Sequence, residues 1–219
     1  MSMEIAKRLA ELKESLPDGV TLGAVSKTKD DSAIMEAYEA GHRVFGENRV
    51  QELTAKYERL PKDIQWHMIG HLQRNKVKYL APFVSLIQGV DSPRLLREID
   101  KRGRQAGRVI DCLLQVHIAE EDSKFGFDRE ELEELLAGGS LREMEHVRVR
   151  GMMGMATFTD NTAQVRREFA SLKALYDRWL EADPRADILS MGMSGDYRIA
   201  LEEGSNMVRI GSSIFGARD

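Results

Sequence analysis

The sequence is poor in the residues that define several classes of protein. It has one cysteine among 219 residues, Cys112, inside an apolar run, which excludes a disulfide scaffold and favours a buried, inert thiol. It has five prolines, and no proline-rich or serine-rich stretch separates two halves, so a single domain over residues 1–219 is expected. No apolar run is long enough to cross a bilayer, and we expect no membrane partner.

The sequence also lacks a marked excess of one charge sign. Lysine and arginine together number 32, aspartate and glutamate 36, and the formal net charge is -4. The basic residues are interspersed with acidic ones along predicted helices, where they form solvated faces. This pattern argues against a nucleic-acid partner, because affinity for the phosphate backbone needs clustered basic residues.

The histidines lack the companions of a metal site. They have no cysteine or carboxylate at ligand spacing, so no metal is expected; they lie at positions 42, 67, 71, 117 and 146. At the amino end, Ile5, Leu9, Leu12 and Leu16 follow helical spacing among charged residues, which predicts an amphipathic helix and argues against a secretory signal. We therefore expect a cytoplasmic protein.

Eight apolar runs bounded by turn signals predict eight β-strands. Most of these runs are continuously apolar, which is typical of parallel strands covered on both faces. The runs span residues 20–26, 44–46, 65–69, 84–90, 109–118, 149–156, 188–193 and 207–210.

Helical periodicity fills the intervals between the strands. Ser92 and Pro93 open one helix, Asp128 opens another, and the longest helix covers about residues 162–181. Eight strands alternating with helices predict a single (β/α)8 TIM barrel in the α/β class, preceded by an extra amino-terminal helix. A doubly wound open sheet is the alternative, because strands are easily miscounted from one sequence.

Glycine and serine gather after the last two predicted strands. Ser194 and Gly195 follow the seventh strand, and Gly211 and Ser212 follow the eighth. Backbone N–H groups at such turns, or in the first turn of a following helix, form a site for a phosphate group. Barrels of this kind often bind phosphate with the loops after strands seven and eight. The sequence therefore predicts a phosphate site here.

Lys27 directly follows the first predicted strand, which neighbours the eighth strand in a closed barrel. In full contact with water it would be a solvated amine without chemistry. Partial burial favours the neutral amine, which attacks an aldehyde and forms a Schiff base. We therefore predict that a phosphorylated aldehyde bridges the two turns and Lys27.

Arg209, on the eighth predicted strand, has two interpretations. Facing outward, it would pair with a helix carboxylate. Facing inward beside Lys27, it would donate a hydrogen bond to the ring nitrogen of a pyridine cofactor and disfavour protonation of that nitrogen. Such a ring is a poorer electron sink, so extended carbanion chemistry becomes harder.

Three further residues are candidate cofactor contacts. Asn48 either caps a helix starting at residue 49 or hydrogen-bonds a ring oxygen of the ligand. His67 is either a core histidine or a cofactor contact. Met193, with Met155, is expected to wall the ligand, whereas the other methionines of the sixth and seventh strands fill the core.

Several segments match one protein family in the right order. They are Ala24-Val25-Ser26-Lys27-Thr28-Lys29, Phe45-Gly46-Glu47-Asn48, residues 66–76 (WHMIGHLQRNK), Ser123-Lys124-Phe125-Gly126, Leu189 to Ser194 and Val208 to Gly216. With these motifs the chain resembles the YggS/PROSC family of pyridoxal phosphate homeostasis proteins along nearly its whole length.

The resemblance implies a barrel like the alanine racemase N-terminal domain, in which Lys27 carries pyridoxal 5′-phosphate as an internal aldimine. It implies that Arg209 faces the pyridine nitrogen. It also aligns Lys124 with an accessory cofactor contact of the family. The residues implied to surround the phosphate are Ser194, Gly195, Gly211 and Ser212.

Two classes of function fit this resemblance. The first is a protein of pyridoxal phosphate homeostasis that holds the cofactor without dedicated catalytic turnover, with pyridoxal-phosphate-dependent apoenzymes as candidate partners. The second is a pyridoxal-phosphate-dependent amino acid racemase. Racemases of the related fold take a tyrosine from an additional domain of a partner subunit, and we expect no such domain after the eighth strand and no tyrosine at a strand end. We therefore predict the non-catalytic role, and the family resemblance implies a monomer. A Schiff-base aldolase acting on a sugar phosphate is a third, weaker interpretation.

Overall fold

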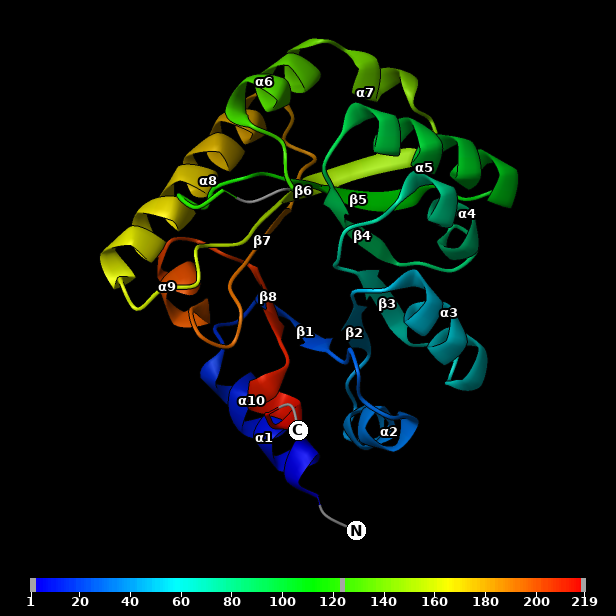
Figure 1. Ribbon diagram of the computed structural model, residues 1–219, viewed down its shortest axis with the longest axis vertical. Helices are drawn as coiled ribbons and strands as arrows, with labels where there is room; N and C mark the ends of the chain where they lie inside the picture. Colours follow the sequence, from blue (N-terminus) through cyan, green and yellow to red (C-terminus); the bar gives the residue numbers. More distant parts are fainter. Residues whose placement is uncertain (1–2, 123–124, 218–219) are drawn as a thin grey trace.

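Eight parallel strands close into a barrel in which each strand pairs with its neighbours in sequence and β8 pairs with β1 (Figure 1). The computed structural model describes residues 3–122 and 125–217. The predicted TIM barrel is thereby confirmed. The strands are β1 (Thr21–Val25), β2 (Val44–Glu47), β3 (Gln65–Met68), β4 (Leu86–Val90), β5 (Ile110–Gln115), β6 (Val147–Gly154), β7 (Ile188–Met191) and β8 (Met207–Ile210).

The pairing of β1 with β8 shows that the open-sheet alternative is wrong. Thr21 lies opposite Met207, and Ala24 lies opposite Ile210. All eight strands fall within the predicted runs or within a few residues of them. β7 ends at Met191, earlier than predicted, because Gly192 leaves the extended conformation with φ of +106°.

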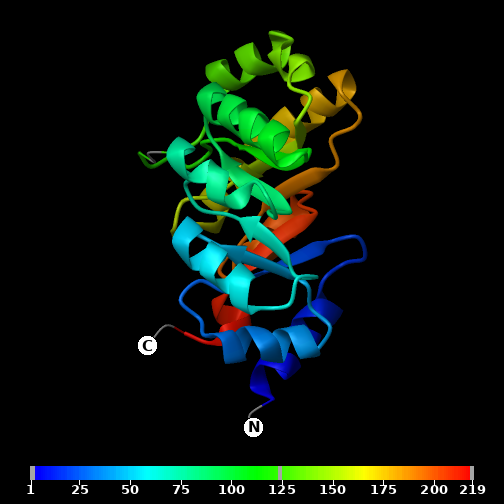
Figure 2. The same ribbon diagram turned by 90° about the vertical axis from the view of Figure 1, so that its right-hand side faces the viewer.

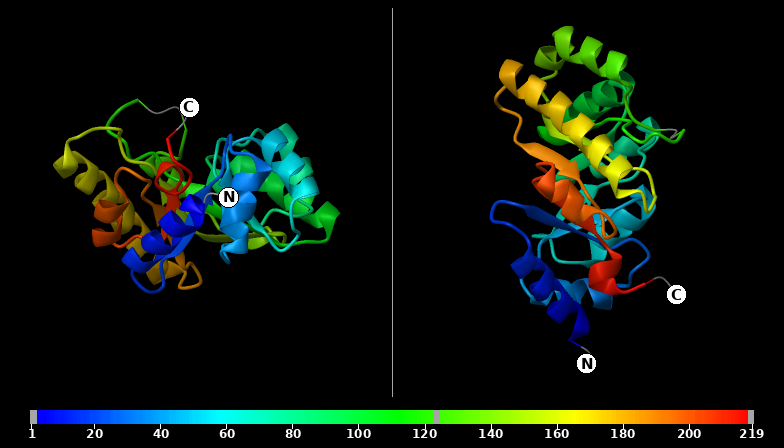
Figure 3. Two further views of the ribbon diagram at one scale, coloured as in Figure 1. Left: turned by 90° about the horizontal axis from the view of Figure 1, so that it is seen from below. Right: turned by 90° about the vertical axis from the view of Figure 1, so that its left-hand side faces the viewer.

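Helices form a ring outside the strands (Figures 2 and 3). The extra amino-terminal helix is present and packs against the last helix and against α2. The longer helices are α1 (Glu4–Ser15), α2 (Asp31–Glu39), α3 (Val50–Arg59), α5 (Pro93–Ala106), α6 (Arg129–Ala137) and α8 (Thr162–Ala182). The short ones are η1 (Arg74–Lys76), α4 (Val77–Leu80), α7 (Ser140–Glu143), α9 (Tyr197–Glu202) and α10 (Ser212–Phe215).

Local signals in the sequence explain where the long helices begin. The Ser92 side chain accepts the Leu95 N–H at the start of α5, with Pro93 in the first turn. Asp128 and Glu131 form a capping box at the start of α6. The short helices are absent from the sequence-based prediction, because one or two turns show no periodicity.

The core has two parts. The larger lies between the strands and the helices, and its most bulky buried side chains include Trp66, Phe45, Phe127 and Phe169. The smaller joins one side chain from each of five consecutive strands and therefore fills the inside of the barrel. Its members are Leu86, Leu113, Met153, Ile188 and Met207.

Within the described ranges, no helix is long and apolar enough to cross a membrane. The same residues contain no group of three or more histidine, cysteine, aspartate or glutamate side chains that could hold a metal ion. Cys112 is buried, and burial raises the pKa of its thiol. This is the environment of an unreactive thiol.

Candidate functional site

The carboxyl ends of β7, β8 and β1 meet at one side of the barrel mouth. The backbone N–H of Arg209 donates to the Gly192 carbonyl oxygen over 2.9 Å, which joins β8 to the turn after β7. On the other side, a Cβ placed on Gly211 would lie 3.2 Å from the carbonyl oxygen of Val25, the last residue of β1. The two predicted phosphate turns therefore lie next to each other and next to the end of β1.

The turn after β7 requires glycine at its first position. Gly192 is in the left-handed region, and a Cβ there would lie 2.8 Å from the Ala200 Cβ and 2.9 Å from the Tyr197 Cα. The Asp196 carboxylate accepts the Met193 N–H over 2.8 Å and closes the turn. These contacts fix the backbone before Ser194 and Gly195.

Both turns present backbone donors. In the described part of the chain, the N–H groups of Ser194, Gly195, Ser212 and Ser213 donate to no protein acceptor. Nothing lies within 4 Å of a Cβ built on Gly195, so the space beside this residue is open. Four such donors on neighbouring turns suit the oxygens of a phosphate group.

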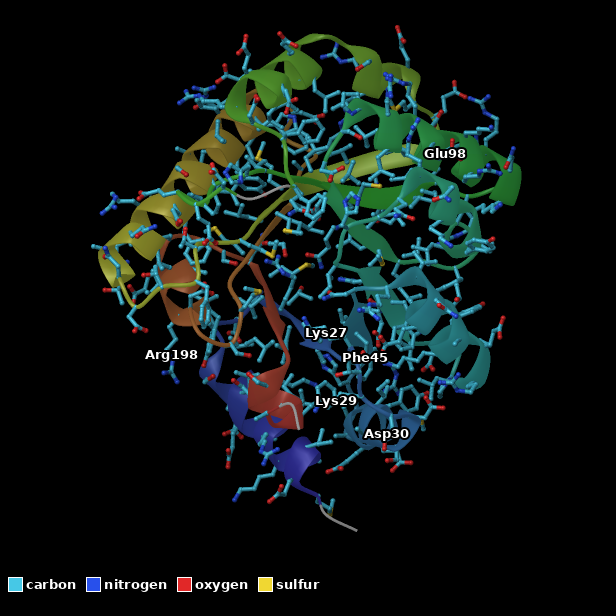
Figure 4. All side chains as sticks on the ribbon, viewed as in Figure 1. Lys27, Lys29, Asp30, Phe45, Glu98 and Arg198 are labelled. Carbon is cyan, nitrogen blue, oxygen red and sulfur yellow. The ribbon has the colours of Figure 1, made fainter. Side chains whose placement is uncertain are left out.

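Lys27 lies half-buried at the mouth, directly after β1 (Figure 4). Successive side chains along a strand point to opposite faces. The preceding Ser26 side chain bonds Glu47, which in turn bonds Lys56 on the outer helix α3. Alternation therefore places Lys27 on the side of the barrel axis, with the partial burial that its predicted amine chemistry requires.

Arg209 faces the inside of the barrel and is 3% exposed, so the outward-facing alternative is wrong. Its guanidinium donates to the hydroxyl and the carbonyl of Ser190 and to the Gly154 carbonyl. Within residues 3–122 and 125–217, all its hydrogen-bond partners are neutral oxygens. Burial lowers the pKa of Arg209 to about 10, against the opposing effect of the nearby Asp196 carboxylate. The side chain therefore remains a cation at neutral pH.

A chain of hydrogen bonds leads from Arg209 across the barrel interior. Ser190 Oγ donates to Gln88 Oε1 over 2.6 Å, and Gln88 Nε2 donates to His67 Nδ1 over 2.9 Å. Burial lowers the pKa of His67 to about 4, so its ring is neutral at pH 7. His67 also lines a cavity of about 440 Å³ at the amino end of the barrel. These contacts are those of a core histidine, and a direct bond from His67 to the cofactor stays a prediction.

Asn48 follows β2, and its interpretation as a helix cap is wrong. Helix α3 begins at Val50, its N-cap residue is Arg49, and no side-chain hydrogen bond caps it. Asn48 instead lines a cavity of about 570 Å³, with His71 and Tyr79 among the other lining residues. A hydrogen bond to a ring oxygen stays a prediction.

The methionines of β6, β7 and the turns after them divide into an exposed pair and a buried group, and contact of the exposed pair with the ligand stays a prediction. Met193 is 37% exposed and Met155 is 38% exposed, and both follow strand ends at the mouth. Met152, Met153 and Met191 are buried. The other accessory candidate, Lys124, lies outside the described residues.

Three residues near the site are not predicted from the sequence. Gln88 and Ser190 are single polar residues inside apolar strands, a pattern that signals a satisfied buried polar group without naming its partner. Asp196 follows Gly195 in a turn, where aspartate is common for local reasons. Its bond to the Met193 N–H becomes apparent only in three dimensions.

Comparison with known proteins shows the family of this chain. The family described as "Alanine racemase, N-terminal domain" matches residues 2–219. A pyridoxal phosphate homeostasis protein of Aquifex aeolicus (strain VF5) is 43% identical over 199 residues, which cover 90% of this chain and 86% of that protein. The chain belongs to the pyridoxal phosphate homeostasis protein family. The Escherichia coli (strain K12) member is 36% identical over 237 residues, covering 99% of this chain and 97% of that one.

Solved structures confirm the fold of this family. PipY of Synechococcus elongatus PCC7942 is 38% identical, covers 97% of this chain and 100% of its own, and has a TM-score of 0.92 without pyridoxal phosphate. The PipY structure with pyridoxal phosphate bound gives a TM-score of 0.87. An alanine racemase of Clostridium difficile 630 is 14% identical with a TM-score of 0.81, a likeness of fold alone, and the chain spans 57% of its length.

Proposed function

We propose that this protein binds pyridoxal 5′-phosphate reversibly, as a Schiff base on Lys27, and takes part in intracellular homeostasis of that cofactor. Its relatives are named for that role, and the similar PipY has been solved with the cofactor bound. One observation carries the proposal: half-buried Lys27, the unsatisfied donors of two turns and buried Arg209 come from three adjacent strands.

The residues at the mouth fit the groups of this ligand. Arg209 would donate to the ring nitrogen, Asn48 to a ring oxygen, and Met193 would cover the ring. The residues that would hold the phosphate are Ser194, Gly195, Gly211 and Ser212. A buried guanidinium whose protein partners, among the described residues, are neutral oxygens is costly, and a ligand that accepts a hydrogen bond offsets part of that cost.

The bound cofactor supplies an aldehyde. The neutral Lys27 amine adds to the aldehyde carbon, a C=N bond replaces the C=O bond, and the oxygen leaves as water with the two amine hydrogens. Arg209, a cation with a pKa of about 10, disfavours a proton on the ring nitrogen. A ring in this state is a poor electron sink, which supports storage of the cofactor without dedicated turnover.

Borohydride reduction followed by mass spectrometry tests the covalent bond. We expect a yellow protein that, once reduced, carries one pyridoxyl group on Lys27. Lys27→Ala should lose the absorbance and still fold, because a side chain beyond a strand end contributes little to the core. Lys29→Ala is the matched control, since Lys29 is also half-buried and lies two residues further along the same loop.

Three other outcomes would contradict the proposal or favour a different function. A folded Lys27→Ala protein that stays fully yellow would contradict the proposed attachment. A colourless wild type that reduction links to a sugar phosphate would indicate an aldolase. Racemisation of alanine at the rate of a dedicated enzyme would favour the racemase over the storage role.

Reversible attachment also suggests release to pyridoxal-phosphate-dependent apoenzymes in the cytoplasm, from a monomer. Direct transfer predicts that an apo-aminotransferase regains activity faster with the loaded protein than with the same concentration of free cofactor. Equal rates would argue for release into solution first. Light scattering should give a mass near 24.8 kDa.

A further inference from the structure

Both neighbours of Lys27 in the chain are held by one ionic cluster. The cluster consists of Glu47 at the end of β2 and of Glu52 and Lys56 on α3. Lys56 Nζ lies 2.6 Å from Glu47 Oε1 and 2.8 Å from Glu52 Oε1. The Glu47 side chain is completely buried, and the Lys56 side chain is 4% exposed. The Glu47–Glu52–Lys56 cluster therefore lies between α3 and the carboxyl ends of β1 and β2, on the outer side of the barrel wall.

On the amino side of Lys27, the cluster binds Ser26 twice. Lys56 Nζ donates to the Ser26 carbonyl oxygen over 2.8 Å, and Ser26 Oγ donates to Glu47 Oε1 over 2.8 Å. The Ser26 N–H continues the sheet by donating to the Gly46 carbonyl over 3.0 Å. The three ammonium hydrogens of Lys56 thus have three acceptors, one of which is the residue before Lys27.

On the carboxyl side, the cluster binds Thr28. The Thr28 N–H donates to Glu52 Oε1 over 2.6 Å. Thr28 has φ of +63°, a left-handed conformation that a β-branched residue adopts only when its surroundings impose it. The bond to Glu52 supplies one such constraint. Lys27 therefore lies between two residues whose backbones bond different members of one cluster, Ser26 to Lys56 and Thr28 to Glu52.

A buried ionic cluster often stabilises a core less well than apolar packing does. Taking charges out of water costs free energy, and apolar residues of similar volume often serve stability as well or better. Within the described chain, Glu47 Oε2 has no hydrogen-bond partner, and burial raises the pKa of this carboxyl. Packing alone does not account for these features, whereas the fixing of one strand end does.

We propose that Lys56, held by Glu47 and Glu52, is a positioning residue that fixes the register of the Ser26–Thr28 backbone so that the Lys27 amine reaches the cofactor aldehyde. A slip of one residue would turn Lys27 toward the helices, because side chains alternate along a strand. The inference rests on the proposed attachment to Lys27 and adds to it a part of the chain that touches no ligand.

The test separates covalent from non-covalent binding. Pyridoxal 5′-phosphate engages the phosphate turns, the residues proposed to contact its ring, and Lys27. Pyridoxamine 5′-phosphate has the same phosphate and ring but no aldehyde, so it engages every part of the proposed site except the covalent bond to Lys27. The main variant is the double replacement Glu47→Leu/Lys56→Met, which removes both buried charges together and leaves neither one unpaired. Both ligands are titrated into the purified protein, with absorbance and fluorescence as readouts.

The double variant should form the Schiff base with at least tenfold lower apparent affinity, while its affinity for pyridoxamine 5′-phosphate stays within threefold of wild type. Glu52→Ala, at a partly exposed position, should give a smaller loss of the same kind and serves if the double variant does not fold. Arg59→Met is the matched control. It removes an exposed ion pair with Asp31 from the same helix and should change neither affinity.

Three results overturn the inference: Schiff-base formation within twofold of wild type in the folded double variant, the same in Glu52→Ala when the double variant does not fold, or an equal loss of both ligands. The wild-type protein separates this failure from that of the proposed function. If reduction of the wild type labels no lysine, or labels one other than Lys27, the proposed function itself fails. If the wild type is labelled on Lys27 and the variants react equally well, only the positioning role is lost.

Discussion

At the amino end of the barrel each of two arginines meets carboxylates, whereas at the carboxyl end Arg209 meets neutral oxygens. Arg150 pairs with Asp187 and with Asp111, and Arg148 forms two hydrogen bonds to Asp111 at 2.8 and 2.9 Å. These arginines are at least 31% exposed, so their charges also meet water. The charged groups at the amino end therefore need no ligand to balance their charges.

At the carboxyl end of the barrel, the buried arginine has no ion-pair partner among the described residues. Arg209 is almost completely buried. Its partners among the described residues are the Ser190 hydroxyl, the Ser190 and Gly154 carbonyl oxygens and, at 3.5 Å, Gln88. In the same part of the chain, the backbone N–H groups of two neighbouring turns have no acceptor. A structural site evolves toward pairing, whereas a binding site keeps groups that only its ligand completes. The difference between the two ends therefore supports the proposed site at the carboxyl end.

The largest expected effect comes from replacing one arginine at each end. Arg209→Met should weaken retention of pyridoxal phosphate by about 10- to 100-fold, because it removes a charge-assisted hydrogen bond of about 1.5–3 kcal/mol. The free energy of unfolding of the apo-protein should stay within about 1 kcal/mol of wild type or rise, since an uncompensated buried charge is lost. Titration of the cofactor and urea denaturation measure the two quantities.

Arg150→Met is the counterpart and should behave in the opposite way. It breaks half-exposed ion pairs to Asp187 and Asp111, which lowers the free energy of unfolding by about 1 kcal/mol or less and leaves cofactor binding unchanged. Loss of cofactor in Arg150→Met, or unaltered retention in Arg209→Met, would remove the distinction between the two ends.

The difference between the two ends of the barrel could be predicted only partly from the sequence. Lys27 and the glycine turns are predictable because each lies directly after an apolar run, and the relation between strand and turn is local. The closed barrel follows from eight such runs in alternation with helices. Arg209 could be assigned to a strand, but its inward orientation depends on the register of β8 with β1.

The partners of these residues depend on distant parts of the chain. Ser190 bonds Gln88, which is 102 positions away in sequence, and Arg209 reaches the same Gln88 across 121 positions. Lys56 resembles any solvated lysine of an amphipathic helix, and its burial becomes apparent only when α3 packs over the ends of β1 and β2. Closure of the barrel creates these contacts, and no local pattern encodes them.

Acid pH should lower the stability of the protein through His67, which lies in the hydrogen-bond chain that leads to Arg209. The pKa of His67 is about 4 in the folded protein and near 6.5 in the unfolded chain, so between these values the unfolded state binds the additional proton. The free energy of unfolding should therefore fall as the pH drops, by about 2 kcal/mol between pH 7 and pH 5 from this histidine. Urea denaturation at the two pH values measures it, and His67→Gln should remove that part of the pH dependence.

His42 provides the control for this prediction. Burial also lowers its pKa to about 4, but its Nε2 bonds the Val44 carbonyl at the start of β2, away from the Arg209 chain. His42→Gln should flatten the pH dependence of stability to a similar extent. Only His67→Gln should alter cofactor retention, because His67 accepts the Gln88 amide N–H in the hydrogen-bond chain that leads to Arg209, whereas His42 lies outside that chain. Equal behaviour of the two variants would separate His67 from the site.

Two glycines of the turn after β7 separate the stability of that turn from its binding of phosphate, and one of them gives the smallest expected change in stability. Gly192→Ala forces a Cβ into the left-handed region against Ala200 and Tyr197, and should lower the free energy of unfolding by about 1–3 kcal/mol. Gly195→Ala meets open space and should change it by less than about 0.5 kcal/mol. Because that open space is where the phosphate is expected, Gly195→Ala should still weaken cofactor binding severalfold, as measured by titration. If Gly195→Ala binds the cofactor as wild type does, the phosphate lies elsewhere, and the unsatisfied donors of this turn no longer set the carboxyl end apart from the amino end.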